Sequence, residues 1–147
     1  MKDSAVSVIV CDTGPLVAAA LSNDSYHHSC VRLFNDLHAA GRELLIPATV
    51  VAEVGYLLAR EAGPRVESLF LQSIANGDFT AVDLNAVDYA RMADLVIKYG
   101  SLLLGTTDAS VIAIAERLKL TEVATLDRRH FNIVRPDHVT ALTLLPQ

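Results

Sequence analysis

Four acidic residues stand out because of where they fall in the sequence. Asp12 directly follows the β-branched run SAVSVIVC, and Asp127 directly follows the run EVATL. If these runs are neighbouring strands of a parallel sheet, both carboxylates emerge at the same edge, beyond the carboxyl ends of the strands. Each acid alone can also be a turn residue or a helix cap, because Asp is common after strands.

Two further acids border the apolar faces of expected helices. Glu53 has Val50 and Leu57 as its neighbours at i−3 and i+4, so it borders or interrupts a buried face. A buried carboxylate needs a cation, because an unpaired buried charge is costly. Glu53 can otherwise lean to solvent or pair with an arginine such as Arg60. Asp108 begins the helical pattern DASVIAIAERL, where an acid also complements the helix dipole.

Acids from four separate segments can converge on one edge of a sheet. Carboxylates that lie so close repel one another unless a cation neutralises them. Their hard oxygen ligands favour Mg²⁺ or Mn²⁺, one or two ions in number. A carboxylate cluster that holds such ions is the machinery for in-line displacement at a phosphodiester.

Strand-like and helix-like segments alternate along the chain and must position these acids. We expect strands over residues 4–11, 43–47, 79–84, 122–126 and 139–144, and helices over residues 15–21, 25–40, 49–62, 65–75, 85–99 and 107–118. Thr49 and Asn85 are the expected N-caps of two helices, and Gly63 is an expected C-terminal stop. The alternation predicts an α/β fold with a mainly parallel sheet covered on both faces.

Composition limits the class of protein. The 147 residues correspond to one domain. With 52% hydrophobic and 20% charged residues, the chain is not a disordered one. The formal net charge of −5 is opposite to that of a basic nucleic-acid-binding domain. The apolar excess suggests a partner surface, in a groove between residues 25–40 and 49–75.

The sequence also bears on the compartment. Two cysteines, Cys11 and Cys30, are too few for a disulfide framework, so we expect a reducing, cytoplasmic location. Asp12 and Pro15 interrupt the stretch that would form the apolar core of a secretory signal. No apolar run reaches the roughly 18 residues that a membrane span requires, so we expect no membrane association.

The four acidic segments resemble the motifs of the PIN-domain family, and within it the VapC-type toxins of bacterial toxin–antitoxin pairs. The matching pieces are CDTGPLVAA with Asp12, PATVVAEVGYLL with Glu53, TTDASVIAIAERL with Asp108 and VATLDRRHF with Asp127. Their order and spacing fit, and the resemblance covers essentially the whole chain. It implies a single PIN-like domain over residues 1–147. The implied fold has three α/β/α layers around a mainly parallel five-stranded sheet.

The resemblance also implies an activity. It predicts an Mg²⁺- or Mn²⁺-dependent endoribonuclease that hydrolyses RNA with metal-activated water, and leaves 5′-phosphate and 3′-hydroxyl ends. The same four acids would hold the metal and orient the water. Thr13 and Thr125 match hydroxyl positions beside the acids, where they can bond a carboxylate or a metal-bound water. A homodimer and a cognate antitoxin that inhibits it are the implied partners.

Arg128, Arg129 and His130 directly follow Asp127. They form either a small basic patch for phosphates beside the site or a solvated loop. Only 5% of the residues are aromatic and none is Trp, which argues against a platform for base stacking. The five histidines are expected to have structural or surface roles rather than to bind metal.

Other classes of protein share single features with this chain. Asp-Thr-Gly is also the signature of aspartic proteases, but their fold is nearly all-β. A dehalogenase-type phosphatase needs a second acid two residues after Asp12, where this chain has Gly14. The remaining alternative is a PIN-like module that binds metal for stability, binds RNA or a protein, and cleaves nothing. The presence of all four acids favours the enzyme.

Overall fold

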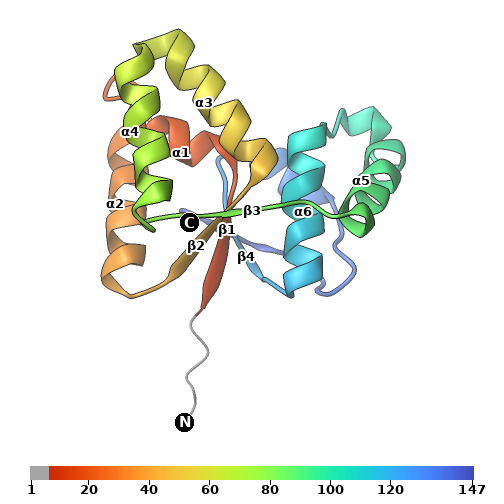
Figure 1. Cartoon of the computed structure of the whole chain (residues 1–147). Helices are drawn as coiled ribbons and strands as arrows, with labels where there is room; N and C mark the ends of the chain where they lie inside the picture. Colours follow the sequence, from red (N-terminus) through yellow and green to blue (C-terminus); the bar gives the residue numbers. More distant parts are fainter. Residues whose placement is uncertain (1–6) are drawn as a thin grey trace.

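Five parallel strands form the centre of the molecule (Figure 1), and the computed structural model describes residues 7–147. The strands are β1 (Val8–Cys11), β2 (Glu43–Pro47), β3 (Thr80–Val82), β4 (Glu122–Ala124) and β5 (Thr143–Leu145). Their order across the sheet is β3-β2-β1-β4-β5, and each neighbouring pair is parallel. In the central strand, Ile9, Val10 and Cys11 have no exposed surface. This burial explains the continuous apolar run in the sequence.

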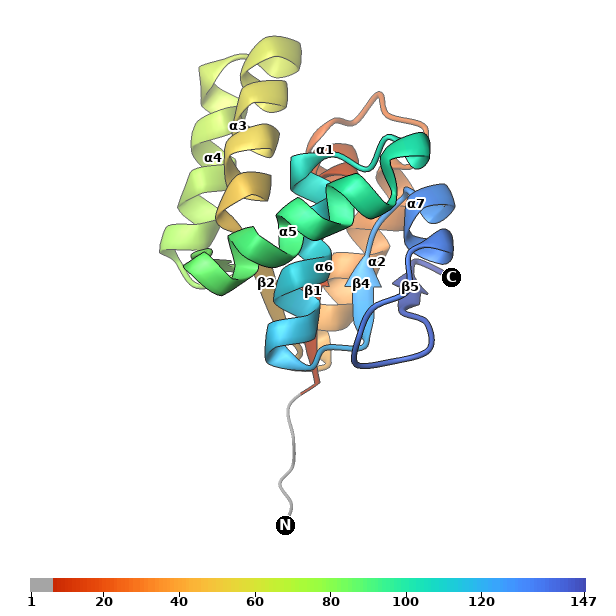
Figure 2. The same ribbon diagram turned by 90° about the vertical axis from the view of Figure 1, so that its right-hand side faces the viewer.

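Helices cover both faces of this sheet (Figures 1 and 2). One face carries α1 (Thr13–Ala20) and α2 (His27–Ala39), and the other carries α5 (Ala86–Lys98) and α6 (Thr106–Leu118). The helices α3 (Ala48–Ala62) and α4 (Pro64–Ala75) form a packed pair that continues from β2. The short helix α7 (Arg128–Ile133) lies between β4 and β5 in the chain. The predicted α/β/α layers and five-stranded parallel sheet are therefore confirmed.

The chain reverses its direction of travel across the sheet between β1 and β4. From β1 it adds β2 and β3 on one side, and β4 and β5 follow on the other. Ligands of open α/β sheets bind beyond the carboxyl ends of the strands at this kind of reversal. Asp12 follows β1 there, and its backbone N–H donates to the carbonyl of Ala124 at 2.8 Å, which ties the two strand ends together.

Helix α6 is buried along most of its length. Its residues from Ala109 to Ala115 are all at most 2% exposed. A helix that is apolar all round must be enclosed by protein, and α6 packs against α5, α3 and the strands β1 and β2. The acid at its first turn, Asp108, is therefore held on a rigid support.

Two expected helix ends are confirmed. Asn85 caps α5 in a reciprocal capping box, in which its side chain accepts from the Asp88 N–H and the Asp88 carboxylate accepts from the Asn85 N–H. Gly63 ends α3 with a φ of 87°, a left-handed value that glycine adopts at least cost.

The predicted N-cap at Thr49 is wrong. Helix α3 begins at Ala48 directly after Pro47, so Thr49 already lies inside the helix. Its hydroxyl instead lies 2.6 Å from the hydroxyl of Ser110 in α6. The Ser110 hydroxyl donates in turn to the Thr107 carbonyl at 2.6 Å, so Thr49 is the donor to Ser110. These bonds join the start of α3 to the start of α6.

The ends of several elements differ from the prediction. The first strand begins at Val8, and residues 4–6 of the predicted strand lie outside the described residues. The last strand starts at Thr143 rather than at residue 139. Helix α7 and a 3₁₀ turn, η1 (Gly100–Leu102), were not expected. Both are too short to leave a periodic apolar pattern.

Candidate metal centre

Asp12 is a buried carboxylate at the carboxyl end of β1. Only 5% of its surface is exposed, and its Oδ2 accepts a hydrogen bond from the Thr125 hydroxyl at 2.8 Å. Burial raises the pKa of Asp12 to about 6. The hydrogen bonds from Thr125 and from the Thr13 backbone lower this pKa, and the charges of Asp108 and Asp127 raise it. Asp12 therefore lies within electrostatic reach of both other acids.

Thr125 links two of the acids through one hydroxyl. Its Oγ1 donates to Asp12 and accepts from the Asp127 backbone N–H at 2.9 Å. This contact matches the supporting position expected for Thr125. The other expected hydroxyl, Thr13, begins α1 directly after Asp12. Its Oγ1 is buried and has no hydrogen-bond partner among residues 7–147. A buried hydroxyl in this state can bond to a ligand of the site.

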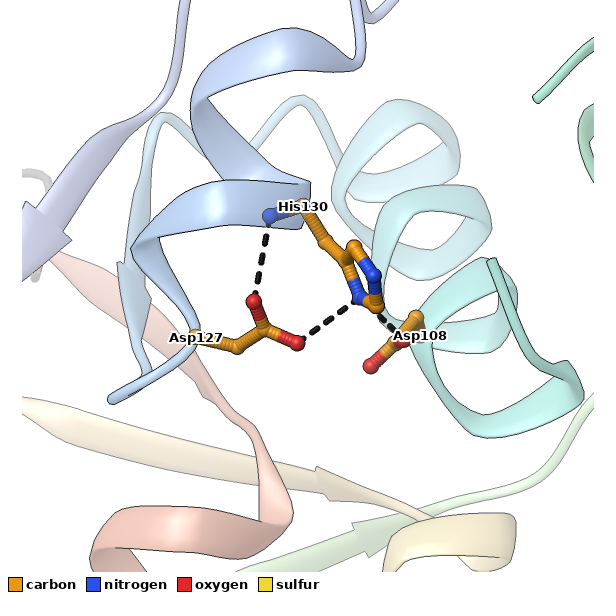
Figure 3. A group of neighbouring side chains, drawn as sticks. All are labelled: Asp108, Asp127 and His130. Carbon is orange, nitrogen blue, oxygen red and sulfur yellow. Dashed lines mark hydrogen bonds and ion pairs between the residues drawn. The ribbon is translucent and has the colours of Figure 1, made fainter. Parts of the chain in front are cut away.

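Asp108, Asp127 and His130 meet in one cluster (Figure 3). The Nδ1 of His130 lies 3.0 Å from the Asp108 Oδ2 and 2.8 Å from the Asp127 Oδ2. One ligand atom from each of the three residues lies within 4.8 Å of the others, a spacing at which they could hold a metal ion. All three side chains are partly buried.

The charge of Asp108 is poorly compensated. Burial raises the pKa of its carboxyl, and the nearby charge of Asp127 raises it further. The hydrogen bond and charge of His130 and a bond from the Gly105 backbone lower this pKa but do not cancel the rise. A divalent cation among these carboxylates would favour their charged forms.

Asp127 has a second, structural role. Its Oδ1 accepts from the His130 backbone N–H at 3.1 Å, so Asp127 is the N-cap of α7. The interpretation of this acid as a helix cap is therefore correct. Its other carboxylate oxygen faces His130 and Asp108 (Figure 3). One side chain thus starts α7 and contributes to the acidic cluster.

Glu53 lies apart from the cluster. It is exposed on α3, so it leans to solvent at the edge of the buried face. Its Oε1 accepts a hydrogen bond from the Thr107 hydroxyl at 3.3 Å, which places it beside the residue that precedes Asp108. The arginine considered as its partner, Arg60, instead pairs with Glu61.

The residues after Asp127 are helical rather than a loop. Arg128 and Arg129 are exposed on the first turn of α7, and the Arg128 guanidinium donates to the Pro146 carbonyl. His130 points to the acids, whereas the sequence suggested only a structural or surface role. If a helix had been predicted after Asp127, the proximity of His130 to Asp127 would have been expected, because residues three apart share one face of a helix.

Comparison with known proteins identifies the family. The model of the PIN domain matches residues 9–136. The chain belongs to the PIN-domain family, as its motifs predicted. It is 33% identical over 103 residues to Ribonuclease VapC26 of Mycobacterium tuberculosis, an alignment that covers 70% of this chain and 76% of that protein. The resemblance to VapC-type proteins is thereby confirmed.

Solved structures share the fold. VapC20 of Mycobacterium tuberculosis, described as a toxin that cleaves the sarcin-ricin loop, superposes with a TM-score of 0.70 at 17% identity, over 78% of this chain and 86% of that chain. The structure of VapBC2 of Rickettsia felis, bound to a DNA fragment from its promoter, superposes with a TM-score of 0.66 at 16% identity, over 93% of this chain and 96% of that chain. FitAcB of Neisseria gonorrhoeae superposes with a TM-score of 0.62 at 15% identity, over 92% of this chain and 95% of that chain.

None of the helices between residues 7 and 147 has both the length and the apolar character needed to cross a bilayer.

Proposed function

We propose that this chain is an Mg²⁺- or Mn²⁺-dependent endoribonuclease and the toxin of a toxin–antitoxin pair. The observation that carries the proposal is the convergence of Asp12, Asp108 and Asp127 where the strand order reverses, with raised pKa values at Asp12 and Asp108. Its relative VapC26 is named a ribonuclease, which favours RNA as the substrate.

The donor set fits a hard divalent cation. Asp12, Asp108 and Asp127 supply carboxylate oxygens, the ligands that Mg²⁺ and Mn²⁺ prefer. The Thr13 hydroxyl, which has no hydrogen-bond partner among the described residues, follows Asp12 in the chain and adds a further polar atom. When bound, one or two such ions would activate water and neutralise the charge that develops at the phosphodiester.

The acidic residues have different proposed roles, which follow from how each is positioned. Asp12 is fixed by Thr125 and holds the innermost position, and Asp108 and Asp127 flank it from α6 and from the start of α7. Glu53 lies on α3 beside Thr107, and its exposed carboxylate is proposed to orient the attacking water. The hydrogen bond from Thr107 fixes Glu53 relative to Asp108.

Arg128 and Arg129 are proposed to bind the RNA backbone. Both side chains are exposed and both residues directly follow Asp127, on a chain whose net charge is −5. A local basic patch can bind phosphates despite the overall sign. Arg129 is the freer of the two, since Arg128 already donates to the Pro146 carbonyl.

An apolar pocket supports a protein partner. It lies between α1, α2 and α4, and has a volume of about 290 Å³. Leu16, Phe34 and Phe70 are among its lining residues, and Leu69 at its side is 63% exposed. An amphipathic helix of an antitoxin would bury these side chains. A second copy of the chain is the other proposed partner.

The test of the nuclease uses purified protein and total cellular RNA. We expect cleavage with Mg²⁺ or Mn²⁺, no cleavage with chelator, and no cleavage by Asp12→Asn with metal present. The products should carry 5′-phosphate and 3′-hydroxyl ends. Ends with a 2′,3′-cyclic phosphate would contradict the mechanism. Metal-dependent stability without cleavage of any RNA would favour a non-catalytic binding module.

A short reading frame beside the gene would encode the candidate antitoxin, and the test of the partner co-expresses the two chains. We expect a complex that no longer cleaves RNA, and we expect Leu69→Asp to weaken it. A complex that cleaves RNA at the rate of the free chain would contradict the antitoxin proposal.

A further inference from the structure

The histidine in the acidic cluster has both ring nitrogens in defined environments. The His130 Nε2 lies 3.0 Å from the carbonyl oxygen of Leu102, at the end of η1. A carbonyl only accepts hydrogen bonds, so this nitrogen must carry a proton and donate. In the neutral ring, the other nitrogen then carries a lone pair. The contact with Leu102 thus selects the tautomer in which Nδ1 is free to act as a ligand.

That second nitrogen faces two carboxylate oxygens. Nδ1 lies 3.0 Å from the Asp108 Oδ2 and 2.8 Å from the Asp127 Oδ2 (Figure 3). A lone pair repels both oxygens unless a cation lies among the three atoms. A proton on Nδ1 can point along only one of the two directions at a time. A metal ion contacts all three atoms at once.

The distances suit one coordination sphere. Octahedral Mg²⁺ binds its ligands at about 2.0–2.1 Å, so adjacent ligands lie about 2.8–3.0 Å apart. The two distances from Nδ1 to the carboxylate oxygens fall in this range. The bond from Nε2 to a backbone carbonyl is the outer contact that metal-bound histidines commonly make.

We propose that His130 binds the divalent metal through Nδ1, together with Asp108 and Asp127. The inference rests on the proposed metal-dependent nuclease and adds a nitrogen ligand to its carboxylates. Imidazole binds first-row transition-metal ions, Mn²⁺ among them, better than it binds Mg²⁺. The site should therefore prefer Mn²⁺ to Mg²⁺, and His130 should be the source of that preference.

The first measurement is pulsed electron paramagnetic resonance of Mn²⁺ bound to the chain without a histidine tag. A directly bound imidazole gives a nitrogen coupling to Mn²⁺, and labelling the histidines with ¹⁵N should change it. Titration of Mn²⁺ against the free-ion signal gives the affinity, and competition with Mg²⁺ gives the preference. None of these readouts depends on RNA cleavage.

Two variants assign the nitrogen. His130→Gln keeps an amide N–H that can reach the Leu102 carbonyl but lacks the Nδ1 lone pair. We expect it to lose the nitrogen coupling and to bind Mn²⁺ at least about 10- to 100-fold more weakly, the loss that removal of an outer contact of a ligand already causes. His28→Gln is the matched control, because His28 is exposed on α2. It should keep the coupling and the affinity.

The outcomes separate the two proposals. Mn²⁺ bound by the ¹⁵N-labelled wild type with no histidine coupling would overturn the role of His130, and would leave a carboxylate site intact. A coupling that persists in His130→Gln would overturn it too. A wild type that binds no Mn²⁺ and cleaves RNA in chelator would refute the metal-dependent nuclease itself.

Discussion

The two ends of helix α6 use carboxylates in opposite ways. Near its C-terminus, Glu116 accepts two hydrogen bonds from Arg91, at 2.8 and 2.9 Å, and a third from the Asp137 backbone. At its N-terminus, Asp108 lies among Asp127 and other acids, with a histidine as its one close basic neighbour in the described part of the chain.

The pKa directions record this difference. Burial raises the pKa of both carboxyls. Burial is the largest single influence at Glu116, but the hydrogen bonds from Arg91 and the Asp137 backbone, with the charges of Arg91 and His138, together outweigh it and lower the pKa. At Asp108 the neighbouring acid adds to burial, so its pKa is raised. Glu116, a structural carboxylate, is neutralised by an arginine of the chain, whereas the acids at the sheet edge have no arginine partner among the described residues and would need a bound cation.

The largest expected effect is the loss of RNA cleavage when Asp108, at the N-terminal end of α6, is replaced by its amide. Asp108→Asn should reduce RNA cleavage by roughly 10²- to 10³-fold or more, because it removes a charged ligand of the metal that would stabilise the transition state. The thermal stability of this variant in chelator should be equal to or above that of the wild type. Cleavage rates at saturating Mg²⁺ and melting curves measure both effects.

Glu116→Gln is the matched control. It should keep the cleavage rate but lose about 1–3 kcal/mol of unfolding free energy, because Arg91 loses its charged partner. If Asp108→Asn cleaves at the wild-type rate, or if Glu116→Gln abolishes cleavage in folded protein, the division between a functional and a structural end of α6 is wrong.

The second expected effect is on the free energy of unfolding, which should depend on pH in opposite ways in the Asp12→Asn and Glu116→Gln variants. The pKa of Asp12 rises from 3.8 to about 6 on folding, so the folded chain binds this proton more tightly than the unfolded chain. The charged carboxylate therefore destabilises the fold as the pH rises from about 4 to 6. Without metal, Asp12→Asn should be more stable at pH 7.5 by at most about 3 kcal/mol, and this gain should vanish near pH 4.

Glu116→Gln should behave in the reverse manner. The pKa of Glu116 is lowered on folding, so its charge stabilises the fold above the ordinary value of 4.5. The loss in this variant should be full at neutral pH and should fade as the pH falls through the lowered pKa. Urea denaturation in chelator between pH 3.5 and 7.5 measures both variants. Parallel pH profiles for the two would refute the comparison.

The sequence predicted the sheet and the places of three acids in the fold for one reason. Asp12, Asp127 and Asp108 each lie at the end of a long or strongly apolar element, and the position of such elements is readable from hydrophobic pattern. The order β3-β2-β1-β4-β5 then brings the strand ends together. Hydrophobic pattern therefore predicted where these acids lie relative to the strands and helices.

The parts that the sequence missed depend on contacts distant in the chain. Thr49 reads as a helix cap, yet its hydroxyl is used by Ser110, 61 residues away. His130 reads as a surface residue, because its role depends on Asp108 and on the Leu102 carbonyl. His130 lies on a six-residue helix and Leu102 on a 3₁₀ turn, and neither element is long enough to show a periodic apolar pattern in the sequence.

The smallest effect tests the hydroxyl that links the acids. Thr125→Val has nearly the same shape but loses the donor to Asp12 and the acceptor for the Asp127 N–H. Leaving these buried groups without partners should cost about 1–3 kcal/mol of unfolding free energy. Because Thr125 touches the acids rather than the substrate, we expect cleavage to fall only about 10-fold, with weaker Mn²⁺ binding as its cause.

Thr125→Ser is the control, since it keeps the hydroxyl and removes only a methyl group. It should restore most of the Mn²⁺ affinity and of the cleavage rate at limiting metal. A purely structural role for the Thr125 hydroxyl would instead lower the stability of the Val variant without changing the metal affinity of either variant. Comparing Mn²⁺ titrations of the three proteins at one temperature below melting distinguishes these results, and so shows whether metal binding depends on the hydroxyl that links Asp12 to Asp127.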